Sequence, residues 1–129
     1  MKGKQVFVFG NPELPADSLP IRLLPSLRER FSDVSFLFLD PNEEWEPPDP
    51  LVVIDTVVGI RDVRIFEGID VFTAAPTVSM HDFDALFNLR YLAKLGKLGR
   101  VIVIGVPPEL SADAALPAVV SELEKILPD

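Results

Sequence analysis

Short apolar runs alternate along this chain with segments that repeat apolar residues at helical spacing. The apolar or β-branched runs cover residues 5–9, 34–39, 51–54, 63–66, 69–73 and 101–104. Several are apolar at every position, which is typical of strands buried on both faces of a parallel sheet. The alternation predicts an α/β fold, a three-layer α/β/α sandwich with a central, mostly parallel sheet of about five strands. The two neighbouring runs in the middle of the chain predict one antiparallel hairpin element.

Three helices are expected between and after these strands. Their apolar stripes run from Leu23 to Phe31, from Phe83 to Ala93 and from Leu116 to Leu127. Asp17 or Ser18 is the expected N-cap of the first helix, and Ser111 is the expected N-cap of the last. Pro25 interrupts the first stripe, because proline has no backbone N–H to donate within a helix. We therefore expect a late start or a kink at that position.

Length, charge and composition limit the classes of protein to consider. The 129 residues suffice for one hydrophobic core, so residues 1–129 are expected to form a single domain. A net charge of −8 disfavours nucleic acid as a partner. The absence of cysteine excludes disulfides, thiolate metal sites and a cysteine nucleophile. No apolar run approaches the roughly 20 residues of a membrane helix, and residues 6–9 are too short for a signal peptide. We expect no membrane insertion and a cytoplasmic location.

Polar residues follow several of the predicted strands. In a parallel α/β sheet ligands bind beyond the carboxyl ends of the strands, which directs attention to Asp17, Asp55, His81 and Gly105. Two carboxylates and one imidazole on the same side of a sheet would form a three-ligand site suited to Ni²⁺ or Zn²⁺. Each also has a structural interpretation, since either aspartate could cap a helix or turn and a lone histidine is often structural.

Other motifs give weaker indications of function. Ser79 and His81 suggest a serine hydrolase, but the nucleophile-elbow motif of such enzymes is missing. The turn at residues 10–13 suggests nucleotide binding, but it lacks the glycine spacing of phosphate-binding loops and is better explained as a tight turn. The acidic, proline-rich loop at 41–50 is expected to be solvated, with Trp45 as a potential interface anchor.

Four short motifs follow one another along nearly the whole chain. They are Val6–Pro12, with an acid seven residues after Gly10, Val53–Val57, Ser79–Asp82 and Ile104–Glu109. In this order the motifs resemble those of the NiFe-hydrogenase maturation endopeptidases. The resemblance implies the same α/β/α sandwich. Position by position, it also implies that Asp17, Asp55 and His81 are the metal-contacting and catalytic residues.

The resemblance also implies an activity. Members of that family remove a C-terminal extension from the hydrogenase large-subunit precursor after nickel has been inserted. The nickel arrives with the substrate, and no organic cofactor is expected. The three side chains would complete its coordination and align the scissile peptide bond, and the metal or a carboxylate would activate water.

The chain departs from the usual family pattern around the first predicted ligand. Ala16 stands where a second acid is common, and Leu19 and Pro20 stand where glycine is common. Glu13 and Pro15 lie in a turn that is usually apolar. These differences keep the ligand set and indicate a divergent member. One alternative is a non-catalytic module that binds nickel or the large subunit. Another is a small-molecule hydrolase or nucleotide-binding domain of the same architecture.

Overall fold

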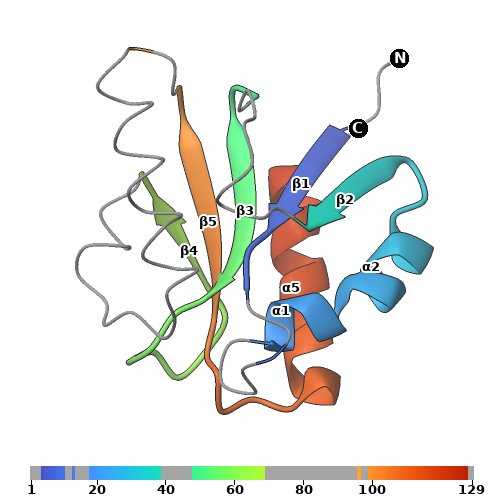
Figure 1. The fold of residues 1–129 in the computed structure, drawn as a ribbon, viewed down its shortest axis with the longest axis vertical. Helices are drawn as coiled ribbons and strands as arrows, with labels where there is room; N and C mark the ends of the chain where they lie inside the picture. Colours follow the sequence, from blue (N-terminus) through green and yellow to red (C-terminus); the bar gives the residue numbers. More distant parts are fainter. Residues whose placement is uncertain are drawn as a thin grey trace.

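A single five-stranded sheet organises the computed structural model, which describes residues 4–10, 13, 18–38, 48–68, 96 and 99–127. The sheet has the order β2-β1-β3-β5-β4 (Figure 1). Its strands are β1 (Lys4–Val8), β2 (Val34–Phe38), β3 (Leu51–Thr56), β4 (Arg64–Glu67) and β5 (Val101–Val106). Neighbouring strands among β2, β1, β3 and β5 pair in parallel, and β4 pairs antiparallel with β5. The predicted fold class, a mostly parallel α/β sheet with one antiparallel element, is confirmed.

The strands lie within two residues of the predicted positions. β3 and β5 each extend two residues beyond the predicted apolar run, so Asp55 lies inside the sheet, at the penultimate position of its strand. One half of the predicted hairpin is β4, and its described neighbour is β5. The other half, residues 69–73, lies outside the described residues. So do most of the predicted acidic loop and the predicted helix over residues 81–95.

Proline shapes the first helical segment. It is divided into α1 (Leu19–Arg22) and α2 (Leu24–Arg30), and each piece has a proline in its first turn. The break lies at Leu23, two residues before Pro25, whose missing N–H cannot bond back to the preceding turn. The predicted interruption is therefore confirmed. Ser18 occupies the N-cap position of α1 without a side-chain capping bond.

The last helix, α5 (Ala112–Ile126), begins where the sequence predicts. The Ser111 Oγ accepts a hydrogen bond from the backbone N–H of Ala114 at 3.1 Å. This bond satisfies one of the N–H groups that a helix leaves without an internal partner in its first turn. Pro117 lies inside the helix.

The sheet buries apolar side chains on both faces. On one face, alternate residues of the strands join α1, α2 and α5 in one core cluster, and these helices gather on that side (Figure 1). We call this the helical face. The other face carries a second buried cluster, formed by Phe7, Phe9, Leu51, Val53, Val57, Val101 and Val103 with Ile60 and Phe66 against it. We call this the aromatic face. Strands apolar at every position therefore bury side chains on both sides, as predicted.

Charged side chains join neighbouring elements at the surface. Arg30 of α2 pairs with Glu124 of α5 at 2.6 Å, and Arg100 next to β5 pairs with Glu67 of β4 at 2.5 Å. Within the described residues, no helix is long and apolar enough to cross a membrane. The single-domain organisation and the cytoplasmic location stay predictions.

Candidate functional site

The order of the strands reverses direction between β1 and β3. From β1 the chain moves outward to β2 and then returns to β3 on the other side of β1. In open α/β sheets, such a reversal separates the connections at the carboxyl ends of the two central strands and leaves space for a ligand. The carboxyl edge between β1 and β3 is therefore the expected ligand position.

Asp55 lies at this carboxyl edge. β1 pairs with β3 only as far as Ile54, while on the other side Asp55 is in register with Gly105 of β5. Asp55 is only 1% exposed, and its Oδ1 accepts a hydrogen bond from the backbone N–H of Thr56 at 2.8 Å. A buried carboxylate is costly unless donors or a cation hold it, and this N–H supplies one donor. Asp55 is thus a buried acid at the expected ligand position.

Thr56 adds a second polar group beside this carboxylate. Its residue is 5% exposed, and its Oγ1 is a buried side-chain atom without a hydrogen-bond partner. Leaving a buried hydroxyl without a partner costs about 1–3 kcal/mol. By strand alternation its side chain projects toward the helical face, opposite to that of Asp55. The end of β3 therefore carries polar side chains on both faces of the sheet.

The other two predicted ligands, Asp17 and His81, lie outside the described residues. So do Ser79 and Trp45. Among the residues that the structure does describe, no three His, Cys, Asp or Glu side chains come together as a metal site. The three-ligand site therefore stays a prediction, and Asp55 is the member whose position the structure gives.

A row of residues beside Asp55 was only partly anticipated from the sequence. Gly105 is in register with Asp55 on one side and with Arg64 of β4 on the other. A Cβ atom at Gly105 would lie 2.8 Å from Phe66 Cε2 and 2.8 Å from Val57 Cγ2, so glycine is needed for this close packing. Sequence analysis singled out Gly105 but missed Arg64. The available signal was an arginine two residues before an aromatic residue on a short strand.

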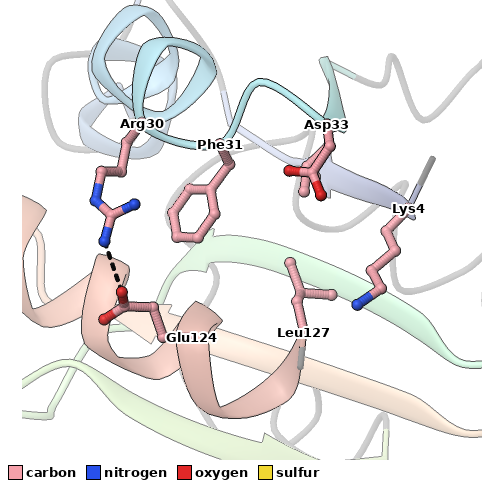
Figure 2. Close-up of a pocket in the computed structure, with 7 residues that line it drawn as sticks. Lys4, Arg30, Phe31, Asp33, Glu124 and Leu127 are labelled. Atoms are coloured by element: carbon pink, nitrogen blue, oxygen red, sulfur yellow. Dashed lines mark hydrogen bonds and ion pairs between the residues drawn. The ribbon is translucent and has the colours of Figure 1, made fainter. Parts of the chain in front are cut away.

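Two hollows among the described residues lie at the opposite, amino edge. The first has a volume of about 380 Å³ and is lined by Lys4, Arg30, Phe31, Asp33, Val34, Glu124 and Leu127 (Figure 2). The second, of about 390 Å³, shares Lys4 and Leu127 with it. In Figure 2 the Arg30–Glu124 ion pair bridges from α2 to α5, and the Arg30 guanidinium lies 5.3 Å from the centre of the Phe31 ring. These hollows are formed around contacts that join elements, and none of the predicted ligands lines them.

One surface ion pair affects titration near β4. The hydrogen bond from Arg100, together with its positive charge, lowers the pKa of the Glu67 carboxyl below its ordinary value. The same contact raises the pKa of Arg100. Both side chains are more than half exposed, so solvent screens their interaction. The pair holds the end of β4 against the start of β5.

Comparison with known proteins places this geometry in context. No protein-family model matches the sequence, and no curated protein matches it. Among solved structures, the chain is similar to the hydrogenase maturating endopeptidase HybD from E. coli, with a TM-score of 0.68 and 18% identity, over 96% of this chain and 94% of that one. It is also similar to an uncharacterized protein from Wolinella succinogenes, with a TM-score of 0.54 and 20% identity, over 97% and 99% of the two chains. At these identities the likeness establishes the fold, and the chain shares the α/β fold of HybD over nearly the full length of both chains.

Proposed function

We propose that this protein is an endopeptidase that removes the C-terminal extension of a NiFe-hydrogenase large-subunit precursor after nickel insertion. The observation that carries the proposal is the position of Asp55, a buried carboxylate at the carboxyl edge where the strand order reverses. The fold shared with HybD over nearly the whole chain supports it, as do the four ordered sequence motifs.

In this proposal the nickel belongs to the substrate. Asp17, Asp55 and His81 bind the nickel and fix the scissile peptide bond beside it. Each side chain has a chemistry suited to the ion, since carboxylate oxygens and a neutral imidazole are both ligands for divalent metals. Fixing the reacting groups in place lowers the barrier, by about 7–11 kcal/mol in the best-oriented cases. The chain has no cysteine, so the chemistry does not use a thiol nucleophile.

The direct test incubates the protein with a nickel-loaded, unprocessed large subunit and follows the mass of that subunit. A discrete loss of mass is the expected result. Asp17→Asn, Asp55→Asn and His81→Ala are each expected to abolish the mass loss, because each removes one ligand. Circular dichroism should show that the variants remain folded.

Asp33→Asn is the matched control. It removes an exposed carboxylate at the amino edge, at the opposite end of the strands from Asp55, and should leave processing unchanged. Near-normal cleavage by any of the three site variants would remove that residue from the ligand set. Binding of the precursor without loss of mass would reject the peptidase and support the non-catalytic binding module.

A further inference from the structure

Three residues from three strands form one row on the aromatic face of the sheet. Arg64 is in register with Gly105, and Gly105 is in register with Asp55. Side chains on a strand alternate between faces, and Phe66, two residues after Arg64, belongs to the aromatic face. Val53 and Val57, on either side of Asp55, belong to it as well. Arg64 and Asp55 therefore project from the same face.

Gly105 leaves the middle of this row open to a neighbouring ring. Because Gly105 has no side chain, the Phe66 ring comes within 2.8 Å of where its Cβ would be. The Arg64 guanidinium lies over that ring, 5.5 Å from its centre. A cation over an aromatic face is attracted by the electrons of the ring. Phe66 therefore restrains the exposed Arg64 side chain near the row.

The charge of Arg64 is not matched by a carboxylate of the described residues. Ion pairs there join Arg30 to Glu124, Arg100 to Glu67 and Lys125 to Glu122. A cation–π contact does not use the N–H donors of a guanidinium. Those donors match the two oxygens of a carboxylate, which a guanidinium binds in a bidentate manner.

We propose that Arg64, supported by Phe66, binds a carboxylate of the peptide held at Asp55 and so selects precursors with an acidic group in the extension. The inference rests on the proposed function. Two strand spacings separate the two residues, about 9.6 Å at ~4.8 Å per strand. An extended peptide covers this distance in roughly three residues. The chain carries a net charge of −8, so a fixed cation here offsets its repulsion of an acidic peptide.

The test measures processing kinetics on the nickel-loaded, unprocessed large subunit from the same organism. Arg64→Gln should raise KM about fivefold and change kcat less than twofold, because the contact is to a part of the substrate that does not react. The KM of Arg64→Lys should lie between those of the unchanged enzyme and Arg64→Gln, since lysine keeps the charge but loses the bidentate geometry. Arg61→Gln is the matched control, because it removes one exposed positive charge three residues away, and it should leave KM unchanged.

Altered precursors identify the carboxylate. In one series each Asp or Glu of the extension is replaced by Asn or Gln. In the other, a Gly-Ser tail moves the terminal carboxylate away. One of these precursors should have a raised KM with the unchanged enzyme. With that precursor, the unchanged enzyme and Arg64→Gln should have the same KM. Loss of that difference in the first series identifies a side-chain carboxylate, and loss in the second identifies the chain terminus.

The outcomes separate the two proposals. Three results would overturn the role of Arg64 while the unchanged enzyme still cleaves, and so would leave the peptidase proposal intact. The first is an equal KM for Arg64→Gln and the unchanged enzyme, and the second is an equal rise of KM in Arg61→Gln. The third is that the effects of Arg64→Gln and of every altered precursor on KM are additive. Absence of cleavage by the unchanged enzyme overturns the proposed function and the role of Arg64 with it.

Discussion

At the scale of single residues, the carboxyl edge depends on a glycine. Gly105 is paired with strands on both sides, and its missing side chain admits the ring of Phe66 and the side chain of Val57. Gly99 has a similar part at the other end of β5, where a Cβ would overlap the carboxyl group of Asp49. The Asp49 Oδ1 accepts the backbone N–H of Arg100 at 2.9 Å. Both ends of β5 thus depend on close approach to a glycine.

Gly105→Ala is expected to destabilise the fold by about 1–3 kcal/mol, because the added methyl group overpacks the space beside Phe66 and Val57. Urea unfolding of the purified variant measures the change. The same substitution in a Phe66→Ala background should cost less, since the ring no longer occupies that space. An equal cost in both backgrounds would show that the ring contact is not the cause.

The sequence allowed Asp55 to be identified but not Arg64, for a physical reason. Asp55 follows a continuous apolar run, and a local pattern of that kind marks the end of a buried strand. Arg64 reaches the same row only because β4 pairs antiparallel with β5 in one particular register. That register depends on contacts between distant segments, which local periodicity does not contain. Asp17 and His81 remain predictions from sequence.

At the scale of elements, α5 shows how strongly a local signal can fix a boundary. Its N-cap, Ser111, was predicted from the sequence, and the structure contains the capping bond. The break before Pro25 was equally predictable, because one missing N–H determines it. The strand with which β4 pairs was harder to predict from the sequence. Adjacent β-rich runs favoured a hairpin, while the described partner of β4 is the more distant β5.

Ser111→Ala should destabilise the protein by about 1 kcal/mol, because the Ala114 N–H loses its side-chain acceptor. Thermal unfolding followed by circular dichroism measures this effect. Ser121→Ala, an exposed change inside the same helix, serves as the control and should be neutral or slightly stabilising. Equal destabilisation by both variants would contradict a capping role.

At the scale of the whole molecule, the stability of the fold at low pH should depend on the Arg100–Glu67 ion pair between β5 and β4. The pKa of Glu67 is lowered from its ordinary value of 4.5, so the Arg100 ion pair stabilises the fold above that value. The contribution is lost as pH falls through the lowered pKa. Glu67→Gln should therefore weaken the protein slightly at pH 7, and the difference from the unchanged chain should be smaller at pH 3.

Urea unfolding at the two pH values measures this difference, and high salt at pH 7 should reduce it. Glu109→Gln removes the same charge from the loop after β5 and controls for net charge. A loss of stability in Glu67→Gln that is undiminished at pH 3, or that Glu109→Gln reproduces, would contradict the assignment to this ion pair.

The reversed direction of β4 has a consequence for how such a protein can diverge. Because β4 runs antiparallel to β5, its first residue, rather than its last, lies at the edge that holds Asp55. The connection over residues 57–63 consequently determines which side chain arrives there. A one-residue insertion there that shifts the register of β4 on β5 by one position would exchange the two sides of β4 and turn Arg64 toward the helical face. Under the proposed role of Arg64, such an insertion would change substrate preference without any substitution among the parallel strands.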